Sequence, residues 1–217
     1  MSLINVTNVI MKDATAKFTD PICVEISFEA LQELKQLIWK VIYIGEANND
    51  ESDQVLEDIE MPIEQVGSMR FTIEAPGPDP TKIRAEELVG VTAILITCSY
   101  NGNEFFRVGY YVNVLYGTDE LNENPPNPPL IDELGRLVMV DQPRVTNFPI
   151  EWDEAAGSST LGIVPPDQIE NFNPTTGFGY TDGDKDARDK MYAQDRKEML
   201  SSANLQSAAE ALQPSFQ

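Results

Sequence analysis

The sequence predicts an all-β sandwich with short helices in its connections, followed by a largely disordered C-terminal tail. Segments rich in β-branched and aromatic residues recur between turn signals from residue 1 to about residue 153. One of these segments, residues 91–98 (VTAILITC), is apolar on both of its faces. Beyond residue 153, Gly, Ser, Pro, Asn and Asp dominate, and the few apolar residues cannot offset the entropy lost on ordering.

Seven strands are expected in the first 153 residues, and their spacing indicates a sandwich of two sheets. Asn101-Gly102 separates two of the strongest strands, and an Asn-Gly pair between alternating apolar residues predicts a tight hairpin. The expected strands are residues 4–11, 22–28, 39–44, 69–74, 91–100, 104–116 and 145–152.

Three short helices are expected between the strands. Residues 119–124 carry acidic side chains in their first turn, and residues 132–139 place apolar side chains near one helical face. A third helix is expected over residues 81–88, and a marginal helix over residues 185–212 of the tail. The sequence thus predicts a folded domain over residues 1–153 and an acidic, largely disordered tail over residues 154–217.

The charge of the chain restricts its partners. Its 217 residues include 36 acidic, 15 basic and no histidine residues, which gives a formal net charge of -21. A chain this acidic would repel a phosphate backbone, so we expect no direct contact with nucleic acid. Basic proteins are the partners that this charge favours.

Cysteine content and hydropathy indicate the compartment. Cys23 and Cys98 are too few for a disulfide scaffold, and we expect both to be buried, reduced thiols. The first residues show no basic region followed by an apolar run, and no stretch approaches the roughly 18 apolar residues of a membrane span. We therefore expect an intracellular, soluble protein that does not enter a membrane.

The sequence offers no arrangement suited to catalysis. Without histidine the chain lacks the commonest general base and the usual zinc ligands. Neighbouring carboxylates such as Asp50-Glu51 and Glu86-Glu87 are typical of solvated loops, and no glycine-rich phosphate loop is present. We expect a binding protein without enzymatic activity, cofactor or metal site.

The strand that is apolar on both faces predicts a binding surface. Alternation places Ile94, Ile96 and Cys98 in the core and leaves Val91, Ala93 and Leu95 on the opposite face. In an antiparallel sheet the second face normally meets water, so apolar residues there indicate a docking surface for a partner.

Neighbouring strands are expected to extend this surface. The same alternation leaves Arg107, Tyr111 and Asn113 beside it and Ile44 at its rim. An apolar floor edged by Tyr and Arg suits an amphipathic helix laid across the sheet. Nearby acidic residues would attract the lysines and arginines of such a partner: Asp50, Glu51, Asp53 and Glu87. The alternative is that a helix or the tail of this same chain covers the face.

Several runs of the sequence, in order and at matching spacing, resemble the anti-silencing-function family of histone chaperones. The resemblance covers nearly all of residues 1–153 and little of the tail. The runs are residues 39–45 (WKVIYIG), 53–56 (DQVL), 89–92 (VGVT), 95–98 (LITC), 105–113 (FFRVGYYVN), 123–126 (ENPP) and 143–146 (PRVT), followed by Trp152.

The resemblance implies an immunoglobulin-like sandwich that acts in the nucleus, as a monomer and without a cofactor. Its partner would be the heterodimer of histones three and four, whose tetramerisation surface it would cover while delivering the dimer for nucleosome assembly and disassembly. The implied contacts to a histone-three helix are Ile44, Asp53, Glu87, Val91, Ala93, Arg107 and Tyr111; the histone-four tail would pair as a strand beside Arg144, Val145 and Thr146.

Three positions depart from the family pattern. Ala93 stands where the family usually has valine, and the two missing methyl groups would weaken the apolar contact by about 1 kcal/mol. Asn48 replaces a glutamate, which leaves Asp53 as the principal partner of a histone lysine. Lys35 and Gln36 replace an acidic pair that the family uses to hold strand-forming basic peptides of downstream chaperones, so a second site of that kind is either lost here or has a changed charge pattern.

A different class of function also fits the sequence. An immunoglobulin-like structural or protein-interaction module could carry the same acidic surface for solubility alone. Such a module would have no affinity for histones, whereas the histone chaperone would bind them at physiological salt.

Overall fold

A computed structural model describes residues 2–152, 182–201 and 204–206. The described residues form mainly strands with few short helices, and the predicted all-β sandwich is confirmed. The chain divides into two compact units, one holding residues 1–152 and 197–217 and the other holding residues 153–196.

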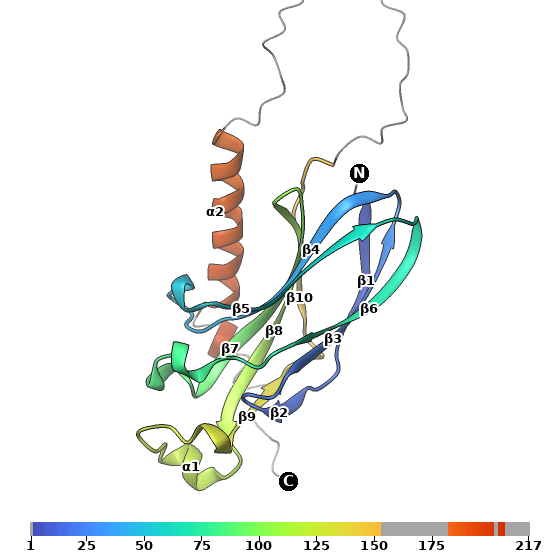
Figure 1. The fold of residues 1–217 in the computed structure, drawn as a ribbon. Coiled ribbons are helices and arrows are strands. Elements are labelled where there is room, and N and C mark those ends of the chain that lie inside the picture. Colours follow the sequence, from blue (N-terminus) through green and yellow to red (C-terminus); the bar gives the residue numbers. More distant parts are fainter. Residues whose placement is uncertain (1, 153–181, 202–203, 207–217) are drawn as a thin grey trace, which may run out of the picture. The chain divides into compact units, whose positions relative to one another are not determined.

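The first unit contains two antiparallel sheets (Figure 1). The smaller sheet has the order β1-β3-β6, and the larger has the order β2-β9-β8-β7-β4-β5 with β10 paired to β8. The strands are β1 (Ile4–Met11), β2 (Thr15–Lys17), β3 (Ile22–Ala30), β4 (Leu34–Tyr43), β5 (Gln54–Ile63), β6 (Gly67–Ala75), β7 (Gly90–Tyr100), β8 (Asn103–Tyr116), β9 (Leu134–Val138) and β10 (Arg144–Asn147).

The main hydrophobic core lies between the two sheets. Trp39 of β4 is fully buried there, with the rings of Phe71, Phe28 and Phe106 centred 5.6, 6.0 and 6.3 Å from its own. β7 contributes Ile94, Ile96 and Cys98 to this core, as the alternation predicts. Burial raises the pKa of the Cys98 thiol well above its ordinary value, so this cysteine is protonated.

The predicted hairpin at Asn101-Gly102 is confirmed. It joins β7 to β8, the two longest strands of the larger sheet. Asn101 has a φ of 49° and Gly102 a φ of 74°. Positive φ at both central residues is what a two-residue hairpin turn demands, and Asn and Gly adopt it at the least cost.

Local sequence patterns failed at β9. The helix expected over residues 132–139 is wrong, because β9 pairs with β8 from Val112 to Tyr116 and extends the larger sheet. Pairing with a long, buried neighbour outweighs the weak helical periodicity of so short a segment. β2 and β5 were not predicted, since β2 has three residues and β5 carries Asp, Glu and Pro, which are depleted in strands.

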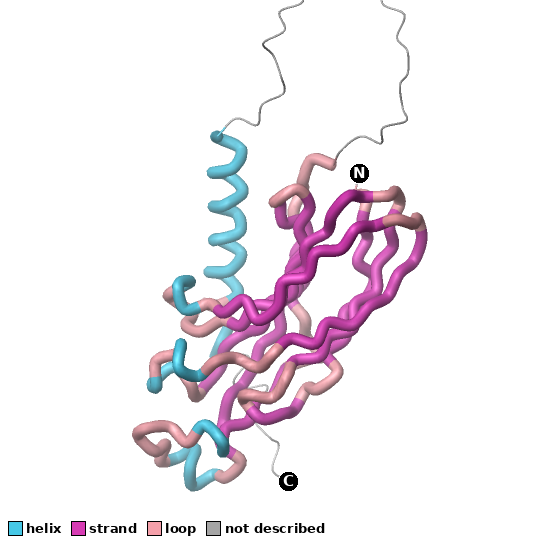
Figure 2. The backbone as a smooth tube through the Cα atoms, in the orientation of Figure 1, coloured by secondary structure: helices cyan, strands magenta, loops and turns pink. Residues whose placement is uncertain are grey.

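The short helices agree with the sequence only in part. Helix α1 (Asp119–Glu123) is confirmed, whereas residues 81–88 form two 3-10 turns, η2 (Pro80–Lys82) and η3 (Ala85–Glu87). Two further 3-10 turns are η1 (Asp50–Ser52) and η4 (Ile131–Glu133). These turns and α1 gather at one end of the strands (Figure 2). The strand expected over residues 145–152 is shorter than predicted and ends at Asn147.

A helix, α2 (Asp182–Met199), occupies part of the tail and overlaps the marginal helix expected from residue 185 onward. Much of the tail predicted to be disordered, residues 154–181, 202–203 and 207–217, lies outside the described residues. None of the described helices combines the length and apolar character needed to cross a membrane.

Candidate functional site

An apolar floor forms on the face of the larger sheet that points away from the core. We define the outer floor as Ile44, Ala93 and Leu95, which cluster together, with Ile42, Ala47 and Tyr111 packed against them. Pairing of β4 with β7 sets Ile42 opposite Leu95, and pairing of β7 with β8 sets Ala93 opposite Tyr111. The predicted alternation thus brings Ala93, Leu95 and Tyr111 onto one surface.

Hydrogen bonds fix Ile44 beside the edge of β7. Its backbone N–H donates to the Ala93 carbonyl at 3.0 Å, and its own carbonyl accepts from the Thr92 hydroxyl at 2.6 Å. These bonds hold Ile44 against Ala93 although β4 has ended at the preceding residue. The floor is therefore built on rigid backbone.

The C-terminal segment of the same chain covers this floor. We use that name for the described residues 198–201 and 204–206. Met199 and Leu200 are 2% and 5% exposed and belong to the floor's own cluster, with Leu205 packed against it. The expectation that the floor is bare is therefore wrong, and the alternative of a cover from the chain's own tail is correct here. Adjacent apolar side chains in a polar tail lose contact with water by packing on this surface.

Polar contacts flank the buried Met199 and Leu200. The Tyr111 hydroxyl donates to the Met199 carbonyl at 2.8 Å, and Arg144 Nη2 lies 2.9 Å from Glu198 Oε1. Burial raises the pKa of Tyr111 above its ordinary value, while the nearby Arg144 acts in the opposite direction. The phenol is thus protonated near neutral pH and can donate this hydrogen bond.

Gly109 of β8 makes room for the covering residue. It pairs with Leu95 across the strands, and a Cβ at this position would overlap the sulfur and the methyl group of Met199. The absence of a side chain at Gly109 therefore leaves a shallow depression beside the floor, and Met199 fills it.

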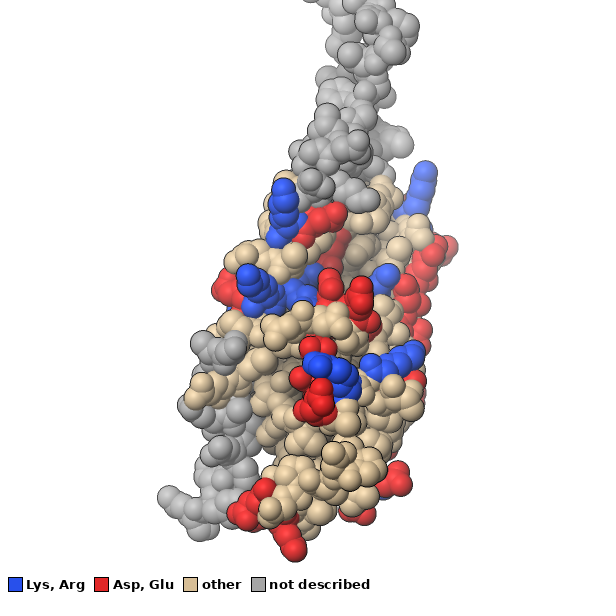
Figure 3. Space-filling view, turned by 90° about the vertical axis from the view of Figure 1, so that its left-hand side faces the viewer, with Lys and Arg blue, Asp and Glu red and all other residues tan. Residues whose placement is uncertain are grey.

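Arg84, which the sequence did not single out, partly neutralises three acidic residues, Glu46, Glu86 and Glu87. Arg84 lies 2.6 Å from a carboxylate oxygen of Glu46, 3.1 Å from Glu86 and 3.3 Å from Glu87. Glu87, expected to face a histone, is thus paired within the chain. Figure 3 likewise shows basic side chains lying among acidic ones on one face of the molecule.

The structure places Asp53 at the end of a 3-10 turn and Arg107 within a strand. Asp53 is half-buried at the end of η1, where its backbone N–H donates to the Asp50 carbonyl at 3.1 Å. Arg107 is only 8% exposed, because Glu104 pairs with it at 2.7 Å and its guanidinium lies 5.3 Å from the centre of the Phe148 ring. Arg107 is therefore a packed residue of β8 rather than an open margin of the floor.

The remaining predicted residues lie outside the floor. Val91 is half-buried two residues before Ala93, opposite Asn113. Arg144, Val145 and Thr146 form most of β10, which pairs with β8 at a sheet edge and leaves Val145 54% exposed.

Lys35 and Gln36 lie at the start of β4, the end opposite Ile44. The pairing of β4 with β5 shifts register between Leu34 and Leu37, so both residues lie in a bulge. Lys35 is exposed and Gln36 is half-buried.

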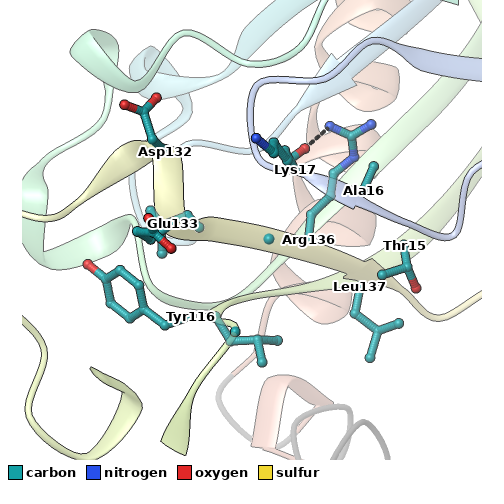
Figure 4. A pocket seen from close by; sticks show the side chains of 12 residues that line it. Thr15, Ala16, Lys17, Tyr116, Asp132, Glu133, Arg136 and Leu137 are labelled. Atoms are coloured by element: carbon teal, nitrogen blue, oxygen red, sulfur yellow. Dashed lines mark hydrogen bonds between the residues drawn. The ribbon is translucent and has the colours of Figure 1, made fainter. Parts of the chain in front are cut away.

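Two hollows of about 400 Å³ each lie away from the floor. One opens beside β2 and β9 and is lined by none of the predicted site residues (Figure 4). The Arg136 guanidinium beside it is buried and donates to the carbonyl oxygens of Lys17, Phe18, Asp20 and Pro21, which fixes the connection after β2. Among the described residues, no three carboxylate or thiol side chains are grouped to hold a metal ion.

Sequence reasoning missed the residues that cover the floor. The one signal was the apolar pair Met199-Leu200 at the end of a charged helix, which the prediction of a marginal helix did not use. Tyr111 and Ala93 were found because strand alternation is strictly periodic.

Comparisons with known proteins agree on one family. The family model described as ASF1 like histone chaperone matches residues 1–153. The Arabidopsis thaliana protein named Probable histone chaperone ASF1A is 44% identical over 175 residues, which are 80% of this chain and 89% of that protein. Histone chaperone ASF1B of the same plant is 48% identical over 166 residues, 76% of each chain. Histone chaperone asf1 of Drosophila melanogaster is 46% identical over 154 residues, 70% of this chain and 71% of the fly protein.

Proposed function

The chain belongs to the family of ASF1-like histone chaperones, and we propose that it binds the heterodimer of histones three and four through the outer floor. A histone chaperone acts by binding rather than by catalysis, and histone binding is the activity that the family assigns to this chain. The bound dimer would be delivered for nucleosome assembly or taken up during disassembly, in the nucleus.

One observation carries this proposal. The outer floor is an apolar surface on rigid strands, and it accepts the end of an apolar-tipped helix, since Met199 is the last residue of α2. A surface that holds one helix end by apolar packing has the shape and chemistry to hold an amphipathic helix of a partner. Covering such a helix would prevent two histone dimers from associating through it.

The charge of the chain supports a basic partner. The net charge of -21 would draw histones toward the sheet, and rim charges mainly raise the rate of association. The apolar floor would then control dissociation. Salt should therefore slow the encounter more than it weakens the final complex.

β10 supports a second contact, to the tail of histone four. β10 contains Arg144, Val145 and Thr146 and lies at the edge of the larger sheet, where the Val145 side chain is exposed. A strand added at such an edge gains affinity from its backbone and specificity from alternate side chains. Charged contacts of the histone-three helix are proposed for Asp53 and Glu87, where Glu87 would exchange Arg84 for a histone cation.

A site for downstream chaperones is proposed at the start of β4. Lys35 is exposed there, beside the edge strand β5. A basic strand-forming peptide would meet Lys35 instead of a carboxylate, so we propose that this site prefers peptides of a different charge pattern.

A charge placed in the floor tests the main proposal. Ala93→Arg should lower the affinity for a recombinant dimer of histones three and four by about 100-fold or more, because it buries an unpaired charge against an apolar helix. Val66→Arg is the matched control, since Val66 is 62% exposed in the turn between β5 and β6.

Titration calorimetry and native gels, at physiological salt, provide the affinity, and thermal unfolding confirms that both variants fold. Equal binding by the wild type and a folded Ala93→Arg variant would refute the assignment of the floor. A wild-type chain with no histone affinity would favour a structural or protein-interaction module instead.

A further inference from the structure

We infer that the C-terminal segment is an internal competitor of the histone dimer, so that the chain regulates its own binding site. The inference rests on the proposed function, because it assigns the regulation of the same floor. In this arrangement Met199 and Leu200 occupy the floor in a closed form, and a partner helix binds the open form.

The two occupants exclude each other by sterics. Ile44 and Ala93 are 0% exposed and Leu95 is 4% exposed with the segment in place. No apolar contact area remains on these three residues for a second helix. Gly109 strengthens this point, because the space above it is filled by the Met199 side chain.

The segment also engages the second proposed contact. Glu198 pairs with Arg144, the first residue of β10, where we place the histone-four tail. The Tyr111 hydroxyl, at the margin of the floor, is bound to the Met199 carbonyl. One short segment therefore contacts both surfaces that the histone dimer would use.

Among the described residues the contact is small, which suits a cover that must leave. Within them it includes two buried apolar side chains, one partly buried leucine, a hydrogen bond from Tyr111 and an ion pair in which the Glu198 side chain is 62% exposed. Such a contact would be too weak between separate molecules. Because the segment is covalently joined to the domain, its docking is intramolecular, and its effective concentration lets a weak contact compete.

The loss of affinity for a partner depends on the fraction of molecules that are in the closed form. Where about nine in ten molecules are closed, the apparent Kd of a ligand for the open form rises about tenfold. The rise is the same for any partner of the floor, and it vanishes when the segment cannot dock.

Accessibility of the floor can be measured without histones. Leu95→Cys places a thiol in the floor, and because cysteine is smaller than leucine it does not push the segment away. Its rate of labelling by a thiol reagent is compared with that of the parent chain, which carries Cys23 and Cys98. Adding Met199→Asp and Leu200→Asp should raise this rate about tenfold, since two carboxylates cannot be buried on an apolar floor.

The matched control adds the same charge at two adjacent exposed positions of α2 outside the segment, with Ala193→Asp and Gln194→Asp. This control should label at the slow rate. Equal rates in all three chains would show that the segment does not close the floor and would overturn the inference. Met199→Ala with Leu200→Ala provides a milder opening should the aspartate pair impair folding, and it should label at an intermediate rate.

Histone titration of the chains that retain Leu95 separates the two proposals. Tighter binding by the Met199→Asp and Leu200→Asp chain than by the control, by about tenfold, supports both. Equal and measurable affinities keep the histone function and overturn the regulation. Absence of binding by every chain, together with faster labelling of the opened floor, refutes the histone assignment while the internal cover stands.

Discussion

The two faces of β7 are equally buried but are closed in different ways. Ile94 and Ile96 point into the core, where the smaller sheet covers them, and Ala93 and Leu95 point outward beneath the C-terminal segment. All four are at most 4% exposed. The smaller sheet, which folds together with β7, covers the inner face. The outer face is covered only by the few described residues of the C-terminal segment.

This difference shows that the exposed fraction of a residue does not indicate how permanently it is buried. Opening the inner face requires separation of the two sheets, which is unfolding. Opening the outer face requires the loss of two apolar side chains from a surface that remains folded, which is a local transition of low free energy. The same strand thus serves as core on one side and as the proposed binding surface on the other.

The largest contrast is expected between large-to-small substitutions on the two faces. Trp39→Ala in the inner core should lower the free energy of unfolding by about 3–5 kcal/mol, because three aromatic rings lose their packing partner. Leu200→Ala in the C-terminal segment should lower the free energy of unfolding by about 1 kcal/mol or less, because the segment can detach without unfolding the domain. Urea denaturation monitored by circular dichroism measures both. Comparable losses would mean that the segment is part of the core.

Two adjacent tyrosines provide a smaller and more selective contrast. Tyr111 donates to Met199 on the outer face, and Tyr110 donates to the Val9 carbonyl on the inner face at 3.1 Å. The hydrogen bond donated by each hydroxyl should stabilise its contact by about 0.5–1.5 kcal/mol. Tyr111→Phe should speed thiol labelling at Leu95→Cys several-fold and leave global stability unchanged, whereas Tyr110→Phe should lower global stability and leave labelling unchanged. The opposite pattern would contradict the division between the two faces.

The smallest effect is expected at the ion pair that flanks the segment. Glu198→Gln removes the partner of Arg144 and should weaken docking by about 0.5 kcal/mol or less, since exposed pairs are screened by water and salt. Labelling at Leu95→Cys should rise by less than about threefold at low salt, and the difference should disappear at high salt. Asp58→Asn breaks the exposed pair with Lys40, which joins β5 to β4 and does not involve the C-terminal segment, and is the control. A salt-independent effect would assign the role of Glu198 to packing.

Strand patterns predicted the parts of the fold that depend on local chemistry. The alternation of β7 and β8 located both faces, and Asn101-Gly102 located the hairpin that sets their register. β9 escaped prediction because its pairing with β8 is made with residues about 20 positions away in the chain. No pattern within residues 132–139 contains that information.

The site was predicted to a similar extent. Ile44, Ala93 and Tyr111 were brought together as expected, because cross-strand pairing follows from parity once the strands are known. Arg107 was placed on the correct strand, and its pair with Glu104 lies within that strand, but its contact with Phe148 depends on the pairing of β10 with β8. Arg84 was missed: Glu86 and Glu87 follow it within three residues, but its shortest pair, with Glu46, joins two loops that are far apart in the sequence.

The sequence by itself determined a two-faced apolar strand in an acidic β domain, because the period of a strand and the charge of side chains are local properties. Only the tertiary structure decided that the second face is occupied by Met199 and Leu200. The physical reason is that an apolar surface specifies burial but not its occupant: any segment with apolar tips, within reach and free of stronger contacts, can cover it. Which segment does so depends on the path of the whole chain.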